Sequence, residues 1–277
     1  MTDGPSKDDK YIMQLCNETS SPLMSNLQAT YILSMSSSLR TTSLDPRLRT
    51  LARRTYVQIN RGHRAVPVED VDTTSKDIVH AVRNACFHAS LHNTGHILIL
   101  EDDAMMLTGG SWESIDRKLV DPKVEIYSLG SIGWFVPDGC THARILGRFI
   151  GFAQAIIYSP KTQRELIDAP LERIKHIDAH FLSYRSGKYG SARPLIVQLF
   201  PRTANMDQWS LSRDSGPCER CGVRFFVCIL HRVLCLHRYH GGWYVLYVFN
   251  YLSVPLLISF AIASLTLISV SAARQLI

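Results

Sequence analysis

The stretch His96-Ile-Leu-Ile-Leu-Glu-Asp-Asp-Ala104 decides the fold of this chain. Its apolar run, residues 97–100, is typical of a strand buried on both faces of a parallel sheet. Three adjacent carboxylates, Glu101, Asp102 and Asp103, follow where such a strand ends. In open α/β sheets, ligands bind beyond the carboxyl ends of the strands. The stretch therefore predicts a buried strand that carries acidic side chains to a ligand-binding site.

Strands alternate with helices on both sides of this run. We expect strands near residues 31–35, 56–59, 124–129, 152–158 and 194–200. We expect helices near residues 46–54, from Thr74 or Ser75 to Gly95, after Ser159-Pro160, and over residues 177–184. This alternation predicts an α/β domain over roughly residues 28–212, preceded by a polar, mobile leader at residues 1–27.

The three carboxylates have the chemistry of a divalent-cation site. Along an extended backbone Glu101 and Asp103 point to one side and Asp102 to the other. Such oxygens bind a hard cation, which in turn neutralises phosphate oxygens. We expect Asp103 to be the direct metal ligand and Glu101 to lie near a ribose or a metal-bound water, while Asp102 ligates or braces the loop. The alternatives are a solvated acidic turn and a two-metal hydrolase, but the further acidic clusters such a hydrolase needs are not found in the sequence.

Composition and charge point away from nucleic-acid binding. The chain is 46% hydrophobic and 19% charged, which is typical of a globular protein, and its formal net charge is +6. Much of the basic excess lies between Arg213 and Arg238, directly before an apolar tail, where it suits anionic lipid. No interleaved basic and aromatic motif indicates a nucleic-acid partner.

The tail from Trp243 to Ala273 contains no Asp, Glu, Lys, Arg or His. A helix needs roughly 20 apolar residues to cross a bilayer, so the segment 243–273 predicts a C-terminal membrane helix that contacts lipid. Its aromatic residues suit the membrane interface. The preceding segment, 213–242, is predicted to be a basic amphipathic juxtamembrane helix.

The cysteines and the charges flanking the tail favour a cytosolic domain. The seven cysteines form no evenly spaced framework, which indicates reduced thiols. The acidic N-terminal stretch does not resemble a signal peptide, and more basic residues precede the tail than follow it. We therefore expect a single C-terminal pass with the domain facing the cytosol. A zinc site is a less favoured reading of one group, Cys218, Cys221, Cys228 and His231.

The acid stretch also carries a family resemblance. Residues 96–104 resemble the "ILEDD" signature of family 25 glycosyltransferases, which include lipo-oligosaccharide and collagen galactosyltransferases, and residues 31–40 are similar to that family's first strand and arginine-containing loop. The resemblance is closer to glycosyltransferase-like proteins of large double-stranded DNA viruses. The similar segments occur in order across residues 28–212, at residues 77–81, 151–159, 176–180 and 194–209. One departure is Phe87-His88, where family 25 members usually have a Ser-His pair.

The resemblance implies a GT-A fold, a Rossmann-like nucleotide-sugar domain. It implies a hexosyltransferase that uses a UDP-sugar and Mn²⁺ or Mg²⁺, inverts the anomeric centre and glycosylates a glycan or protein hydroxyl. Asp178 matches the position of the general base. Carried onto this chain, the nucleotide site comprises Ser34, Met35, Ser36, Arg40, Glu101 and Asp102, with Asp103 and Glu101 at the metal.

Two further interpretations remain open at this stage. His142 is a candidate phosphate or metal contact, although a lone histidine is more often structural. The whole chain is alternatively a non-catalytic, membrane-associated module that keeps the fold and binds a sugar or nucleotide, or acts as a scaffold. Nucleotide binding that requires Mn²⁺ would favour the enzyme.

Overall fold

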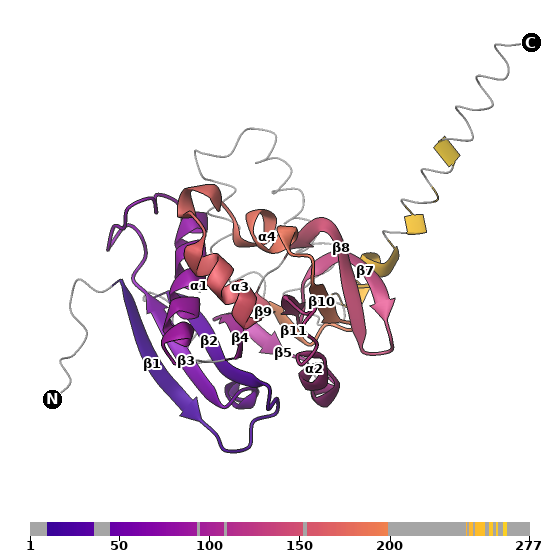
Figure 1. Ribbon diagram of the computed structural model, residues 1–277, viewed down its shortest axis with the longest axis horizontal. Helices are drawn as coiled ribbons and strands as arrows, with labels where there is room; N and C mark the ends of the chain where they lie inside the picture. Colours follow the sequence, from indigo (N-terminus) through magenta and orange to yellow (C-terminus); the bar gives the residue numbers. More distant parts are fainter. Residues whose placement is uncertain are drawn as a thin grey trace, which may run out of the picture.

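The computed structural model describes residues 10–35, 45–92, 95–107, 110–151 and 154–198, together with scattered positions between 242 and 264. The chain folds as a mixed α/β structure around a large mixed sheet (Figure 1). This sheet has nine strands in the order β1-β3-β2-β4-β9-β6-β10-β8-β7, and β5 and β11 form a separate two-stranded sheet. The predicted α/β fold class is confirmed.

Strands and helices are interspersed along the chain. The strands are β1 (Tyr11–Glu18), β2 (Leu27–Met35), β3 (Arg54–Asn60), β4 (His96–Glu101), β5 (Ala104–Met106), β6 (Ile126–Ser128), β7 (Ile132–Asp138), β8 (His142–Gly151), β9 (Ala155–Tyr158), β10 (Lys188–Ser191) and β11 (Ile196–Gln198). The helices are η2 (Pro46–Thr50), α1 (Thr74–Leu91), α2 (Trp112–Lys118), α3 (Pro160–Asp168), η3 (Leu171–Arg173), α4 (Ile177–His180) and η4 (Leu182–Tyr184).

The strand directions bring the carboxyl ends of several strands to one end of the large sheet. β2 runs parallel to β3 and to β4. β9 lies antiparallel between β4 and β6, and β6 is parallel to β10. The strands β2, β3, β4, β6 and β10 therefore all terminate at the same end of the sheet. We call it the acid end, because Glu101 closes β4 there.

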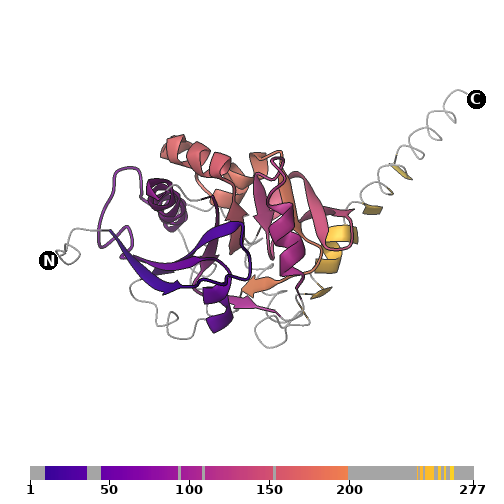
Figure 2. The same ribbon diagram turned by 60° about the horizontal axis from the view of Figure 1, so that its bottom comes forward.

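Two hydrophobic clusters cover the two faces of the sheet. On one face Val82 of α1, Leu166 of α3 and Ile177 of α4 belong to the same buried cluster as Ile99. On the other face η2, α2 and β5 pack in the cluster that contains Leu100. Figure 2 shows α1 and α3 on one side of the first strands and η2 on the other. Burial on both faces explains the unbroken apolar run of β4.

Most predicted elements are present, with local differences. The helix α1 begins after Thr73, whose side chain accepts a hydrogen bond from the Lys76 backbone N–H, and ends before Gly95. The helix predicted at residues 46–54 is wrong in length, because only the short 3₁₀ helix η2 forms before β3 begins at Arg54. The predicted helix at residues 177–184 is divided into α4 and η4 by Phe181.

The predicted mobile leader differs most from the structure. Residues 11–18 form β1, an antiparallel neighbour of β3 at the side of the sheet. Lys10 is buried and forms an ion pair with Asp77 at 2.7 Å. Polar side chains on the exposed face of an edge strand give β1 no continuous apolar signal, and its stability comes from β3, which lies far away in sequence. Residues 1–9 of the predicted leader lie outside the described residues.

The predicted juxtamembrane segment and the four candidate zinc ligands lie outside the described residues, apart from Gly242. Within the predicted membrane segment the described positions are helical, and residues 247–252 form a continuous stretch that we call the tail helix. Among the residues that the structure describes, none of the helices combines the length and the apolarity needed to cross a bilayer.

Candidate functional site at the acid end of the sheet

The acid cluster occupies the turn that connects β4 to β5. Glu101 is the last residue of β4 and is paired with Leu33 of the parallel strand β2. Asp102 and Asp103 form the turn, and β5 begins at Ala104, where it pairs with Gln198 of β11. The second sheet therefore holds the far side of the turn, and the three carboxylates lie beyond the end of a parallel strand, as the sequence predicts.

Ser34 ties the end of β2 to this turn. The Ser34 hydroxyl donates a hydrogen bond of 2.9 Å to Oδ2 of Asp102, which braces the turn. Ser34 and Asp103 are buried, with exposed fractions of 3% and 4%. The alternative of a fully solvated acidic turn is therefore wrong for Asp103. Within the described ranges, no group of three or more His, Cys, Asp or Glu side chains is arranged to hold a metal.

Met35 ends β2 beside this turn and is 43% exposed, so its side chain can contact a ligand at the acid end. Two other predicted nucleotide-site residues, Ser36 and Arg40, lie outside the described part of the chain.

Glu101 and the helix that carries Asp178 lie on the face of the sheet that α1 covers. Burial raises the pKa of Tyr158 well above its ordinary value, and the charges of Cys86, Asp178 and Glu101 raise it further. Ile177, the residue before Asp178, packs in the same buried cluster as Ile99. Glu101 follows Ile99 on the same side of β4, although 77 positions of sequence separate the two carboxylates. The fold thus places the predicted base on the same face of the sheet as the first acid of the cluster.

Asp178 lies in the single-turn helix α4, whose Ile177 is buried in the core. Burial raises the pKa of Asp178, opposed by backbone hydrogen bonds from its own N–H and from Ala179 and by the charges of His176 and His180. A carboxylate whose pKa is raised is a better proton acceptor. The environment of Asp178 therefore suits the role that the resemblance implies for it.

A buried polar cluster that the sequence did not predict lies beside Met35. Met35 pairs with Asn60 at the end of β3, and Nδ2 of Asn60 donates a 3.0 Å hydrogen bond to Oδ2 of Asp77. The Asp77 carboxylate also pairs with Lys10. Gly62, at φ +83°, donates its N–H to Oδ1 of Asn60 at 2.8 Å. The cluster fixes β1, β3 and the start of α1 together at the acid end. Its signal in the sequence was limited to the Asn-Arg-Gly strand stop.

His142 is held by other side chains. Its Nδ1 lies 2.8 Å from the Tyr127 hydroxyl and its Nε2 lies 3.1 Å from the Ser114 hydroxyl. Burial lowers the pKa of His142, and the charge of Lys118 lowers it further. Because both ring nitrogens are engaged, the structural interpretation of His142 is the better one.

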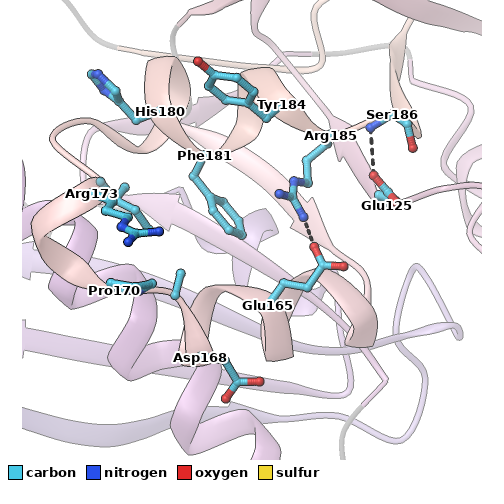
Figure 3. Close-up of a pocket in the computed structure, with 12 residues that line it drawn as sticks. Glu125, Glu165, Asp168, Pro170, Arg173, His180, Phe181, Tyr184, Arg185 and Ser186 are labelled. Carbon is cyan, nitrogen blue, oxygen red and sulfur yellow. Dashed lines mark hydrogen bonds and ion pairs between the residues drawn. The ribbon is translucent and has the colours of Figure 1, made fainter.

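A cavity of about 640 Å³ lies between α3, η3, α4 and η4, away from the acid cluster. Figure 3 shows Phe181 pointing between Arg173 and Arg185, with Arg185 paired to Glu165. Glu125 contributes to the wall and precedes β6, so it lies at the opposite end of the sheet. Neither Glu101 nor Asp178 lines this cavity, and we therefore do not assign it to the candidate active site.

Comparisons with known proteins leave the family unassigned, because no family model and no curated protein matches the chain. The chain is similar in structure to a glycosyltransferase involved in glycosylation of the major capsid of PBCV-1, with a TM-score of 0.41, 12% identity, and coverage of 65% of this chain and 98% of that chain. It is similar to mannose-1-phosphate geranyltransferase from Thermus thermophilus, with a TM-score of 0.35, 11% identity, and coverage of 60% and 74%. It is also similar to A197 from STIV, with a TM-score of 0.40, 8% identity, and coverage of 59% and 81%.

Proposed function

We propose that this protein is a GT-A type, family 25-like glycosyltransferase that transfers a hexose from a UDP-sugar to a glycan or protein hydroxyl, with inversion and with a divalent metal. We further propose that its C-terminal tail anchors it to a membrane. The observation that carries the proposal is the acid turn: Glu101, Asp102 and the buried Asp103 lie at the end of a parallel strand, on a sheet whose helical face also carries α4 with Asp178.

The end of β2 supplies the nucleotide side of the proposed site. Ligands of open α/β sheets bind where parallel strands terminate, and β2 and β4 end side by side here. Ser34 holds Asp102, and the exposed Met35 offers an apolar surface to a base or ribose. In this proposal Ser36 and Arg40 continue the site, with the guanidinium binding a phosphate.

The acid turn has the donor chemistry of a Mn²⁺ or Mg²⁺ site. Carboxylate oxygens are hard donors, and Mg²⁺ is commonly held by one or two carboxylates together with substrate phosphates and water. Asp103 and Glu101 would hold the ion, which supplies positive charge to the diphosphate leaving group. Asp102, oriented by Ser34, keeps the turn in place.

Asp178 acts as the general base in this proposal. Its carboxylate takes the proton of the acceptor hydroxyl as that oxygen attacks the anomeric carbon from the side opposite UDP. The new glycosidic bond forms as the bond to the diphosphate breaks, so the anomeric configuration inverts. The raised pKa of Asp178 strengthens the carboxylate as a proton acceptor.

The central test is UDP binding by titration calorimetry, with and without Mn²⁺. We expect binding that requires Mn²⁺ and is abolished in Asp103→Asn, because the variant removes the proposed metal ligand. The matched control is Asp168→Asn, an exposed carboxylate at the end of α3. Normal metal-dependent affinity in a folded Asp103→Asn protein would contradict the site. A screen for UDP-sugar hydrolysis separates the enzyme from a non-catalytic module, which would bind UDP without turnover.

The proposed membrane orientation has its own test. Arg224, Arg232 and Arg238 precede the hydrophobic tail and Arg274 follows it, which favours a cytosolic domain because positive residues stay cytoplasmic. Protease added to sealed vesicles from expressing cells should digest the domain without detergent. A protected domain, or glycosylation at Asn17, would contradict this orientation. In the structure the Asn17 amide donates to the Arg49 carbonyl at 2.8 Å.

A further inference from the structure

The described part of the hydrophobic tail packs on the domain. The tail helix lies beside β7 and β8 (Figures 1 and 2). The Tyr247 hydroxyl donates to the Ser191 carbonyl at 3.0 Å, and the Tyr251 hydroxyl donates to the Ala192 carbonyl at 3.0 Å. Both rings make edge contacts with Phe135, with centroids 5.3 and 5.7 Å away.

Asn250 completes this docking face. It is 1% exposed, accepts a 3.1 Å hydrogen bond from the Gly133 N–H and donates one of 3.3 Å to the Ser131 carbonyl. Tyr247, Asn250 and Tyr251 are spaced by three and four residues, so they share one face of the helix. Because their hydrogen bonds go to fixed backbone groups, they set both the position and the rotation of the helix.

This docking site lies at the acid end of the sheet. Gly190 pairs with Ser128, Ser128 pairs with Ile156, and Ile156 pairs with Ile99. Ser191 is therefore level with Leu100, and Ala192 is level with Glu101. The strands β10, β6, β9 and β4 are consecutive neighbours, which places the backbone at Ala192, where the helix docks, about 14 Å from Glu101 at ~4.8 Å per strand.

Hydrogen bonds join the two regions across this distance. The Glu101 N–H donates to the Gln154 carbonyl at 3.1 Å, and Nε2 of Gln154 donates to the Gly130 carbonyl at 3.0 Å. Gly130 directly precedes Ser131, which accepts from Asn250. The position of the tail helix is thus fixed relative to the acid turn.

The other face of the tail helix is apolar and exposed. Its side chains, with the flanking helical positions, are Val245, Val248, Phe249, Leu252 and Leu256, and each is about half exposed or more. This face belongs to a sequence from Trp243 to Ala273 that contains no charged residue or histidine, and basic residues precede it. An uncharged apolar surface next to a basic segment matches a bilayer that contains anionic lipid.

We propose that this outer face lies against a lipid bilayer and that the docked helix turns the acid end of the sheet toward the membrane. Resting on the proposed function, the acceptor hydroxyl is then presented at the bilayer surface by a membrane-bound molecule. The inner face of the helix contacts the domain and the outer face contacts the lipid. The helix therefore keeps the active site in a fixed orientation relative to the bilayer.

Two exposed cysteines at different ends of the sheet provide the test. Cys140 lies in the turn between β7 and β8, next to His142, which pairs with Ser191 at the acid end. Cys16 lies in β1, near Asn17, which pairs with Thr55 toward the opposite end. Full-length single-cysteine proteins are labelled with a fluorophore in phosphatidylcholine–phosphatidylserine vesicles. In both proteins Cys86 is replaced by Ala and the other cysteines by Ser. Nitroxide-labelled headgroup lipids then act as short-range quenchers.

We expect several-fold stronger quenching at Cys140 than at Cys16. A triple variant, Tyr247→Phe, Asn250→Ala and Tyr251→Phe, should stay on the vesicles while this difference shrinks, because it removes the hydrogen bonds that set the helix. Tyr184→Phe, at an exposed tyrosine away from the helix, is the control. Equal quenching, stronger quenching at Cys16, an unchanged difference in the triple variant or absence of vesicle binding would overturn the proposal. If instead the proposed function is wrong, the protein will not bind UDP, whereas the quenching pattern will be unchanged.

Discussion

Two carboxylates, Glu125 before β6 and Asp178 in α4, differ in what surrounds them. Glu125 accepts hydrogen bonds from Lys161 at 2.7 Å and from the backbone N–H groups of Ser186 at 2.9 Å and Gly187 at 3.3 Å. Although burial opposes the shift, these donors lower the pKa of Glu125 to about 2. Burial dominates at Asp178 and raises its pKa.

The difference shows how neighbouring groups set the pKa of a carboxylate and so suit it to a structural or a catalytic role. The donors around Glu125 stabilise its negative charge, so it holds α3 and the start of β10 in place and has little affinity for a proton. At Asp178 the local donors do not offset desolvation, so the ionised form is relatively unstable and takes up a proton readily. The comparison therefore favours Asp178 as the base.

The largest expected effect is on transfer by Asp178→Asn. Loss of the proton acceptor should lower the transfer rate by roughly 10²-fold or more, the usual scale of general-base help. Mn²⁺-dependent binding of UDP should remain, because Asp178 is not one of the proposed metal ligands. Rates measured with a donor and acceptor found by screening check this, with Asp168→Asn as the control. An unchanged rate would assign the proton transfer to another group.

Glu125→Gln should lower the free energy of unfolding, because the ionised carboxylate of Glu125 stabilises the fold. The folded pKa of Glu125 lies below its unfolded value, so its contribution is fully present above the unfolded pKa and is lost as pH falls toward about 2. We expect the variant to lose about 2 kcal/mol of unfolding free energy at pH 7. The gap from the natural protein should close between roughly pH 5 and pH 2. Urea titrations across this range measure it, and a gap independent of pH would contradict the assignment.

The pH profile of transfer sharpens the same contrast. Because Asp178 must be ionised to accept a proton, the rate should rise about tenfold per pH unit below its raised pKa and then level off. Asp178→Asn should lack this ionisation. A rise that persists in the variant would show that a different group titrates.

The smallest expected effect is that of Ser34→Ala on nucleotide binding. The hydroxyl of Ser34 orients Asp102, and a hydrogen bond of this kind contributes about 1 kcal/mol, or roughly fivefold in affinity. Metal-dependent UDP binding should weaken by that factor. Ser114→Ala, which removes a hydroxyl that contacts His142 far along the sheet, should leave it unchanged. Equal losses in both variants would point to a general effect on the fold.

Elements with strong local signals were predictable from the sequence. β4 is an apolar run bounded by Gly95 and the acids, and α3 begins after Ser159-Pro160, where the Ser159 side chain accepts from the Thr162 N–H. The β1 strand was not predictable, because its pairing partner β3 lies about 40 residues away and half of its side chains face solvent. The strands β7 and β8 are also absent from the prediction, because the exposed face of β7 carries the apolar Trp134 and Val136 and the strand therefore lacks an alternation of apolar and polar residues.

In the predicted membrane segment, too, the sequence and the tertiary structure determine different properties. Its lack of charge is a property of composition, and the sequence alone indicates an affinity for lipid. That Tyr247, Asn250 and Tyr251 hydrogen-bond to the domain depends on the exact positions of backbone groups on β10 and before β7. Aromatic residues that the sequence assigns to a membrane belt thus serve in part as docking groups.

The sequence by itself determined the acid strand, the α/β class and the residue types available for metal and phosphate, because these follow from local hydrophobic pattern and side-chain chemistry. The tertiary structure decided which of the acids are buried, that Ser34 holds Asp102, and that Asp178 shares a sheet face with Glu101. It also decided the pKa shifts of Asp178 and Glu125, which arise from burial and hydrogen-bond donors brought together by strand register and helix packing.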